Sequence, residues 1–371
     1  MCLNGIITSK YDLFVYLTAL RGTVYLFLPF ARLYFLSEVF LMEYVLLIVG
    51  FALLIKGADL FVDGSSAIAK LLKVPSIIIG LTVVALGTSL PEASISINAA
   101  ILGQNSLALS NVLGSNIFNL LVVLGASALL CPVRAGDGVI KKEIPYNILI
   151  TAVLFVCLIC GMTTDSENVW AAVVGQETAF TLGRICGIIL LLLFAFYLFM
   201  QIRGALKARE ANRDLDGADD GKKISLWKSL IFIVIGAVAI IFGGDIVVDS
   251  ASKIAETLGM SETLIGLTIV SMGTSLPELV TSVVAARKGE SDLALGNAIG
   301  SSIFNILFIL GASAAISPIT VGVSAIYDTL ILIVFSLLTW VFAATKKKIS
   351  RTEGGIMLLA YAAYLAYIII R

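Results

Sequence analysis

The sequence predicts an all-α membrane protein with ten transmembrane helices, arranged as two inverted repeats of five helices each. Two observations lead to this prediction. Hydrophobic residues make up 59% of the chain and charged residues only 13%, whereas soluble domains are about 45–50% apolar. The segment Gly-Leu-Thr-Val-Val-Ala-Leu-Gly-Thr-Ser-Leu-Pro-Glu at 80–92 returns almost unchanged at 266–278. A membrane protein with two related halves follows.

Apolar runs of the length that a membrane span requires occur five times in each half. Crossing a hydrocarbon core of ~30 Å takes about 20 helical residues. The runs lie near 43–64, 76–102, 107–131, 145–163 and 181–202, and then near 229–250, 262–286, 293–316, 320–344 and 354–370. They lack the alternating pattern of barrel strands, which favours helices. We therefore expect five-helix repeats at 42–203 and 228–371, joined by a charged cytoplasmic linker at 204–227 that is too short to bury a core.

Lysine and arginine predict the orientation, because short cytoplasmic loops carry an excess of both. With Met42 placed outside, the loops assigned to the cytoplasm carry 18 basic residues, and the outer loops with the C-terminus carry 3. A basic pair precedes the first motif (Lys70, Lys73) but follows the second (Arg287, Lys288). Since each half has an odd number of spans, the second half enters the bilayer upside down. Inverted repeats are typical of transporters with a substrate site near the midplane.

Residues 1–41 have no counterpart in the second half. The run from Leu13 to Leu36 is apolar enough for an extra N-terminal helix, although Arg21 and Arg32 interrupt it, and Met42 opens the first complete span. A leader sequence and translation upstream of the true start are the alternatives. We assign this extension no function.

Each motif copy places a proline and a glutamate inside an apolar run. Glu92 and Glu278 stand at membrane depth, where ionisable residues are expensive and mark function. Proline removes a helical hydrogen bond, so we expect freed carbonyl groups near Ala85–Thr88 and Ser271–Thr274. Broken helix is tolerated in a bilayer where it is buried or lines a wet cavity. A simple proline kink requires no carboxylate, so the motif predicts an oxygen-lined cation site.

The third span of each half adds a polar stripe with the spacing i, i+4, i+8, which lies on one helix face. The stripes are Asn111, Ser115 and Asn119 in the first half and Asn297, Ser301 and Asn305 in the second. Asn111 and Asn297 suit helix packing through hydrogen bonds as well as they suit a site. We expect the other four residues to line the site.

Four aspartates form two further pairs with i, i+4 spacing, Asp59 with Asp63 and Asp245 with Asp249. They stand near the ends of the first span of each half. We expect them to be interfacial, with a vestibule role as the alternative. Lys56 is expected to snorkel or to pair with an aspartate.

All candidate ligands are oxygen atoms, and the chain has no histidine. Oxygen ligands suit hard cations such as Ca²⁺ and Na⁺, and a flexible shell of many oxygens suits Ca²⁺ better than Mg²⁺. Two glutamates neutralise one divalent ion. They would serve monovalent ions equally, provided that each kind of ion excludes the other.

The paired motifs resemble the two alpha repeats of the cation/Ca²⁺ exchanger superfamily, in its prokaryotic Na⁺/Ca²⁺ exchanger branch. The shared residues are Gly-Thr-Ser-Leu-Pro-Glu in both halves and the later Gly-Ser-Asn/Ser-Ile-Phe-Asn. The resemblance covers about residues 42–371. It implies a secondary antiporter of the prokaryotic inner membrane that exchanges Ca²⁺ for Na⁺ by alternating access at a shared midplane site. It implies no enzymatic activity, no cofactor, no nucleic acid and no obligatory protein partner. The partners that it implies are the two ions and the lipid bilayer.

The resemblance also implies a ligand set. Its members are Glu92 and Glu278 at the centre, Thr88 and Thr274 with carbonyl and hydroxyl oxygens, Ser89, Ser275, Ser115 and Ser301 at flanking Na⁺ sites, Ala85 and Ser271 with backbone carbonyls, and Asn119 and Asn305 facing the centre. An acid often replaces Asn305 in relatives, and in the K⁺-dependent branch it goes with K⁺ coupling, so the asparagine argues against K⁺ transport. The alternatives are a Ca²⁺/H⁺ antiporter that uses the same glutamates and a cation channel.

Overall fold

The computed structural model describes residues 10–163, 179–211, 225–260, 265, 269 and 271–370. Within these ranges eight helices are long and apolar enough to cross a membrane: Leu41–Leu72, Ser106–Leu130, Val139–Cys160, Arg184–Ala211, Leu226–Thr257, Ser291–Ile316, Val323–Lys346 and Arg351–Ile370. A further span consists of Ser76–Thr88 and Leu90–Ile101, which meet at an angle of 52°. The run at 262–286 lies partly outside the described residues, so the tenth span stays a prediction.

The two halves share element boundaries to within one residue at an offset of 186 residues. In the first half α4 is Leu90–Ile101, α5 is Asn105–Phe118, η2 is Asn119–Val123 and α6 is Leu124–Leu130. In the second half α13 is Leu276–Arg287, α14 is Ser291–Phe304, η5 is Asn305–Leu310 and α15 is Gly311–Ile316. The sequence repeat is therefore a structural repeat, and it includes a π-helical turn that begins at the equivalent residues Asn119 and Asn305. Such turns are rare and occur often at functional sites.

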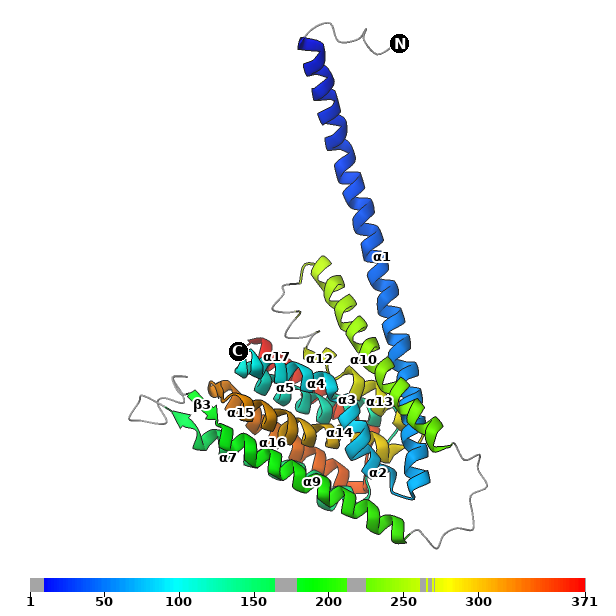
Figure 1. Ribbon diagram of the computed structural model, residues 1–371, viewed down its shortest axis with the longest axis vertical. Helices are drawn as coiled ribbons and strands as arrows, with labels where there is room; N and C mark the ends of the chain where they lie inside the picture. Colours follow the sequence, from blue (N-terminus) through cyan, green and yellow to red (C-terminus); the bar gives the residue numbers. More distant parts are fainter. Residues whose placement is uncertain are drawn as a thin grey trace.

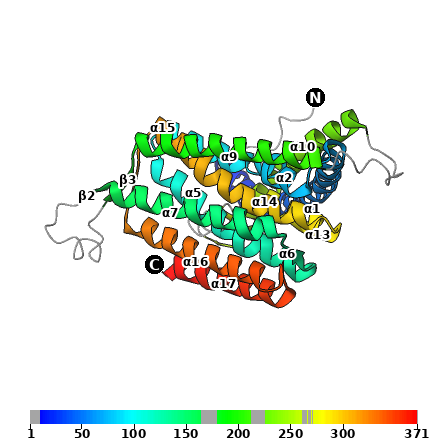
Figure 2. The ribbon, with the colours of Figure 1, turned by 90° about the horizontal axis from the view of Figure 1, so that it is seen from below.

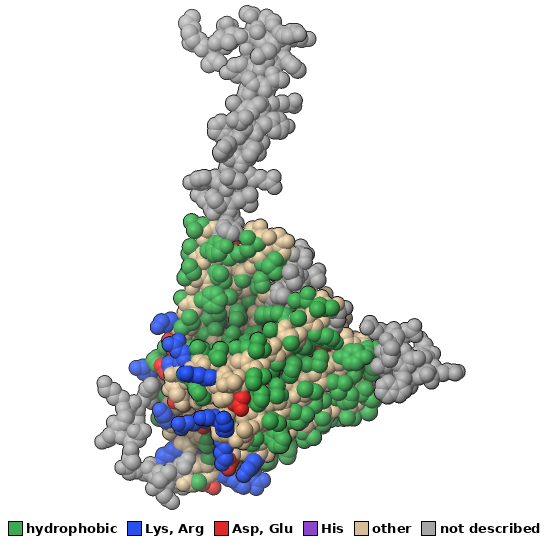
Figure 3. Space-filling model, turned by 180° about the vertical axis from the view of Figure 1, so that it is seen from behind, with side chains coloured by type: hydrophobic (Ala, Val, Ile, Leu, Met, Phe, Trp, Pro, Cys, Tyr) green, Lys and Arg blue, Asp and Glu red, His purple; other side chains and the backbone are tan. Residues whose placement is uncertain are grey.

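Two spans form the centre of the bundle. In Ser106–Leu130 and in Ser291–Ile316, 78% of an 18-residue apolar stretch is buried, against 17–39% in the other six helices of this length. Figure 2 shows α5 and α14 among α7 (Ile144–Cys160), α9 (Arg184–Ala211), α16 (Val323–Lys346) and α17 (Arg351–Ile370). Hydrophobic side chains cover the flank of the molecule in Figure 3, and lysines and arginines gather at one end. This distribution matches a membrane-spanning bundle with a basic cytoplasmic face.

The remaining elements are short. Before the first helix break lie α2 (Ser76–Ile79), η1 (Gly80–Val84) and α3 (Ala85–Thr88), and before the second lies α12 (Ser271–Gly273). A π-helical turn, η3 (Val139–Glu143), leads into α7. β1 (Val133–Arg134) pairs antiparallel with β5 (Lys348–Ile349), and β2 (Met162–Thr163), β3 (Ala179–Leu182) and β4 (Ile319–Val321) form a second antiparallel sheet. Next to β5, Lys347 donates to Asp137 at 2.7 Å and lowers the pKa of that carboxyl group.

The helices α1 (Lys10–Leu72) and α10 (Leu226–Thr257) run side by side at one edge of the bundle (Figure 1). Glycines permit this contact: a Cβ atom on Gly57 would lie 2.9 Å from the Gly236 carbonyl oxygen, and one on Gly236 would lie 2.7 Å from the Gly57 oxygen. Small residues at such positions let two membrane helices approach closely. At one end of the pair, Lys253 and Glu43 form an ion pair of 3.1 Å.

Helices of the structure run past two boundaries expected from the sequence. Residues 10–41 form no separate N-terminal helix, because α1 runs unbroken from Lys10 to Leu72 through the expected start at Met42. The linker expected at 204–227 begins as helix, since α9 continues to Ala211, and α10 starts at Leu226. Hydropathy marks where a helix leaves the apolar core and not where its hydrogen bonding ends. The middle of the linker lies outside the described residues.

Candidate functional site

Each motif interrupts its helix at a serine. Ser89 has φ −87° and ψ 11° between α3 and α4, and Ser275 has φ −94° and ψ 7° before α13. Pro91 and Pro277 stand in the first turn of the helix that follows, where the missing N–H of proline has no helical partner to lose. Each proline therefore stands at the beginning of a new helix, and the broken helix that the motif predicts is present in both repeats.

Glu92 and Glu278 occupy the first turns of α4 and α13, and both side chains are fully buried. The N-terminal end of a helix carries a partial positive charge, which favours a carboxylate there. This compensation is small compared with the cost of removing a charge from water. Two buried carboxylates in one site therefore need further hydrogen bonds or a cation.

The carboxylates are held by serines of the opposite repeat. The Ser89 hydroxyl donates to Glu278 Oε1 at 2.8 Å, and the Ser275 hydroxyl donates to Glu92 Oε1 at 2.9 Å. Ser301 adds a third hydroxyl, which lies 3.3 Å from Glu278 Oε1. The helix breaks and both glutamates therefore meet at the interface between the repeats, as the sequence predicts.

The packing that brings them together depends on α14. A Cβ atom on Gly300 would lie 2.7 Å from Leu81 Cα, and one on Gly80 would lie 3.0 Å from Gly296 Cα. Glycine at these positions lets the core helix of the second repeat touch the backbone of η1 in the first. Ser301, next to Gly300, is thereby placed against the motif of the other half, 3.4 Å from the Ala85 carbonyl oxygen.

Several buried oxygen atoms of the motif elements have no hydrogen-bond partner among the described residues. They are Glu92 Oε2, Glu278 Oε2, Ser115 Oγ, Asn119 Oδ1, Thr274 Oγ1, Thr281 Oγ1 and Asn305 Oδ1. Buried polar atoms are nearly always paired, and an unpaired one is costly. Carboxylate, hydroxyl and amide oxygens are the ligands that Ca²⁺ and Na⁺ take. This donor set therefore fits a cation.

Other predicted ligands already have partners. The Thr88 hydroxyl donates to Asn297 Oδ1 at 3.0 Å. The Ala85 carbonyl oxygen accepts from the Ser89 amide at 3.1 Å, so the helix break does not free this group. Ser271 opens α12, and its backbone lies at the start of the second motif.

Asn111 and Asn297 anchor their spans to the glutamate helices in the same way. Asn111 Nδ2 donates to Ser96 Oγ at 2.9 Å, and Asn297 Nδ2 donates to Ser282 Oγ at 2.9 Å. The same amide groups lie 3.4 Å from the Glu92 carbonyl oxygen and 3.2 Å from the Glu278 carbonyl oxygen. Their packing role is thus the one that the structure supports.

Sequence reasoning missed Asn116, which is fully buried and contacts the second repeat. It follows Ser115 directly and so lies off the i, i+4, i+8 stripe. The signal available in the sequence was the mismatch between Gly-Ser-Asn in one repeat and Gly-Ser-Ser in the other.

A cavity of about 510 Å³ opens between α10 and the two motif helices. Its lining includes Pro91, Thr274 and Pro277 from the motifs together with Asp245 and Asp249 from α10. Their place in this lining favours the vestibule alternative for these two aspartates. The excess of basic residues assigns this end of α10 to the outside.

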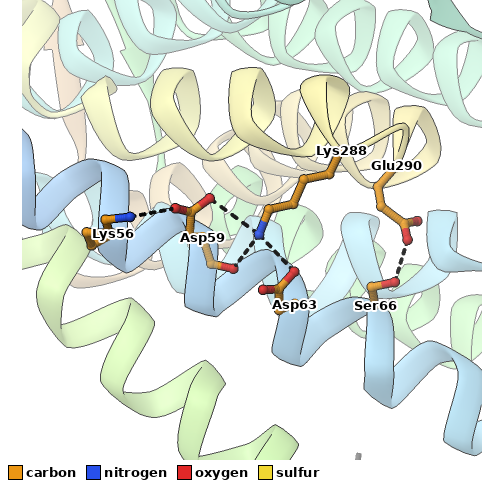
Figure 4. Close-up of polar contacts among 6 residues, drawn as sticks. All are labelled: Lys56, Asp59, Asp63, Ser66, Lys288 and Glu290. Carbon is orange, nitrogen blue, oxygen red and sulfur yellow. Dashed lines mark hydrogen bonds and ion pairs between the residues drawn. The ribbon is translucent and has the colours of Figure 1, made fainter. Parts of the chain in front are cut away.

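The other aspartate pair joins α1 to the loop between α13 and α14 (Figure 4). Lys288 Nζ lies 3.3 Å from Asp59 Oδ1, 2.8 Å from Asp63 Oδ1 and 3.0 Å from the Asp59 carbonyl oxygen. Lys56 Nζ lies 3.8 Å from Asp59 Oδ2, which confirms the expectation that this lysine pairs with an aspartate. Ser66 donates to Glu290 in the same loop. These contacts lie at the end of α1 that the basic residues assign to the cytoplasm.

Comparisons with known proteins find similar sequences and structures. The family model described as sodium/calcium exchanger protein matches residues 42–203 and 228–370. The chain is 37% identical over 330 residues to the putative antiporter CaxA of Alkalimonas amylolytica, covering 86% of this chain and 96% of the relative. It is 34% identical over 343 residues to the sodium/calcium exchanger MaX1 of Methanosarcina acetivorans, covering 87% and 97%. A solved structure of the sodium-calcium exchanger NCX_Mj is similar over 88% of this chain and 99% of its own, with a TM-score of 0.71 and 31% identity.

Proposed function

Because the chain belongs to the sodium/calcium exchanger protein family, we propose that it is a secondary antiporter that exchanges Ca²⁺ for Na⁺ at one site used by both ions. It is an integral, multi-pass protein of a prokaryotic membrane. Its family consists of exchangers and not of enzymes. The relative MaX1 is named a sodium/calcium exchanger, which supports Na⁺ as the coupling ion.

The observation that carries the proposal is the crossed pair of serine–glutamate hydrogen bonds. Each carboxylate uses Oε1 to accept from the other repeat and keeps Oε2 without a partner in the described part of the chain. Two carboxylates carry a charge that one Ca²⁺ or two Na⁺ neutralise. Since both ions need the same oxygens, binding of one excludes the other. Mutual exclusion at one site produces exchange when the empty, negatively charged site is slow to reorient.

Two features on opposite sides of the site support alternating access. The cavity beside Asp245 leads toward Thr274 from the end assigned to the outside. At the other end, Lys288 ties α1 to the core through Asp59 and Asp63. In the proposed mechanism, this arrangement corresponds to a carrier that is open outward. A movement of α1 and α10 over the core would reverse it, as in other inverted-repeat transporters.

Ion-flux measurements in reconstituted vesicles test the proposal. Purified protein is expected to take up radiolabelled Ca²⁺ when an outward Na⁺ gradient is imposed, and K⁺ or H⁺ gradients alone are expected to give no uptake. Uptake driven by a pH gradient without Na⁺ would replace the proposal with a Ca²⁺/H⁺ antiporter. Ca²⁺ flow with no counter-ion would indicate a channel.

A further inference from the structure

We propose that Asn116 is a positioning residue of the cation site. It acts through Asn305, whose side-chain amide it orients so that the amide oxygen faces the bound ion. The inference rests on the proposed function and adds to it a residue outside the motif stripe. It follows from a chain of two hydrogen bonds between the repeats.

The first bond fixes Asn116. Its Nδ2 donates to the backbone carbonyl oxygen of Ser302 at 3.1 Å. A carbonyl oxygen only accepts hydrogen bonds, so the amide of Asn116 has one allowed orientation. The Oδ1 atom of Asn116 therefore points away from this carbonyl. The contact joins equivalent positions of the two repeats, 186 residues apart.

The second bond transmits this orientation to Asn305. Asn305 Nδ2 donates to Asn116 Oδ1 at 3.0 Å. Rotating the Asn305 amide by 180° would set two acceptor oxygens against each other, so the network selects one orientation. The Oδ1 atom of Asn305 is left buried and without a partner in the described residues.

The oxygen that remains belongs to the site. Asn305 follows Ser301 by one helical turn on the same face, and the Ser301 hydroxyl lies 3.3 Å from Glu278 Oε1. If the amide of Asn305 turned over, an NH₂ group would meet the cation and repel it. The orientation set by Asn116 therefore decides whether Asn305 attracts or repels the ion.

The first repeat lacks the equivalent relay. At the position that matches Asn116, the hydroxyl of Ser302 donates to Ala298 of its own helix at 2.9 Å. Both amide atoms of Asn119, the counterpart of Asn305, have no partner in the described part of the chain. Only Asn305 is preset as an oxygen ligand. A carboxylate would present an oxygen in either orientation, so the relay is needed because an uncharged amide stands here.

The test compares Asn116→Ser in two backgrounds. A serine is too short to bridge Ser302 and Asn305. In the otherwise wild-type protein, the variant is expected to raise the KM for Ca²⁺ on the order of tenfold, which corresponds to the loss of about one polar contact with a charged group. The maximal rate should stay the same. In the Asn305→Asp background, where either carboxylate oxygen reaches the ion, Asn116→Ser is expected to change KM less than about twofold.

A matched control separates this role from a loss of packing. Asn147→Ser makes the same change at another buried asparagine, on α7 outside the motifs, and should leave the KM for Ca²⁺ as it is. An equal KM increase from Asn116→Ser in both backgrounds would overturn the relay, and so would a lower maximal rate at unchanged KM. In either case, Na⁺-driven uptake by the wild type would still support the proposed function. Wild-type vesicles without Na⁺-driven Ca²⁺ uptake would refute the proposed function and, with it, the relay.

Discussion

The Ser89 hydroxyl lies 2.8 Å from Glu278 Oε1, so the broken helix of the first repeat holds the carboxylate of the second. The reverse bond, from Ser275 to Glu92, measures 2.9 Å. Neither repeat contains a complete site, because each glutamate takes its serine from the other half. The two repeats must therefore pack correctly before either carboxylate is satisfied.

Replacing either glutamate with glutamine should abolish Na⁺-driven Ca²⁺ uptake. Glu92→Gln and Glu278→Gln keep the side-chain size and still offer an oxygen to the serine, but each removes half of the charge that neutralises Ca²⁺. Uptake in vesicles and the amount of folded, inserted protein are the measurements. Glu256→Gln, at an exposed position near the end of α10, is the control. Wild-type exchange by both site variants would show that these glutamates are not ligands.

Removing one serine should weaken the site without destroying it. Ser89→Ala and Ser275→Ala each delete a hydrogen bond to a buried carboxylate, which is worth about 1.5–3 kcal/mol. We expect the KM for Ca²⁺ to rise at least about tenfold in each variant. The effect of Ser275→Ala should be at least as large as that of Ser89→Ala, because Glu278 Oε1 keeps the Ser301 hydroxyl when Ser89 is replaced. A strong effect of one variant with none of the other would contradict the symmetric role.

Breaking the ion pairs of Lys288 should shift the access of the site rather than the stability of the fold. The side chains of Lys288, Asp59 and Asp63 are 30%, 36% and 49% exposed, and exposed ion pairs contribute about 0–1 kcal/mol. Lys288→Gln should therefore leave the melting temperature nearly unchanged but free α1 from the core at the cytoplasmic end. The outward-open state should become less populated.

A cysteine in the outer cavity measures this shift. In a cysteine-free background, Ser94→Cys lines the cavity and should react more slowly with an impermeant thiol reagent when Lys288→Gln is added. Lys253→Gln is the matched control, because Lys253 pairs with Glu43 and joins α1 to α10 without touching the core. Equal labelling rates in all three proteins would contradict a closing role for Lys288.

Loop labelling tests the inverted topology. Single cysteines at Gln104 and in the linker at 212–224 should react from opposite sides of the membrane, with the linker on the cytoplasmic side. The reason is the excess of basic residues in the loops assigned to the cytoplasm. Labelling of both positions from one side would refute the inverted repeat.

A chain that starts at Met42 should insert and transport. Glu43 pairs with Lys253, and Gly50 and Gly57 pack closely against α10, so these contacts join α1 to the rest of the protein. All of these residues remain in the shortened chain. Ca²⁺ uptake per inserted protein is the measurement. Normal expression with no uptake would show that residues 1–41 belong to the working protein.

The sequence by itself determined the class of fold, the repeat and the central acids. Hydropathy is a local property of the chain, so the apolar runs and the excess of lysine and arginine on one side could be read without a structure. Glu92 and Glu278 stood out for the same reason, as charges inside apolar segments that recur in both halves. The shared boundaries of α4 with α13 and of α5 with α14 confirm the repeat.

Only the tertiary structure decided which groups meet. The Ser89–Glu278 and Ser275–Glu92 bonds join residues 189 and 183 positions apart, and no local pattern encodes such a pairing. It depends on how closely α14 packs on the first repeat at Gly300. The contacts of Asn116 with Ser302 and Asn305 were hidden for the same reason, and the sequence did not choose between the two alternatives for Asp245 and Asp249. Their roles come from contacts between helices, whereas periodicity reports only the face of a single helix.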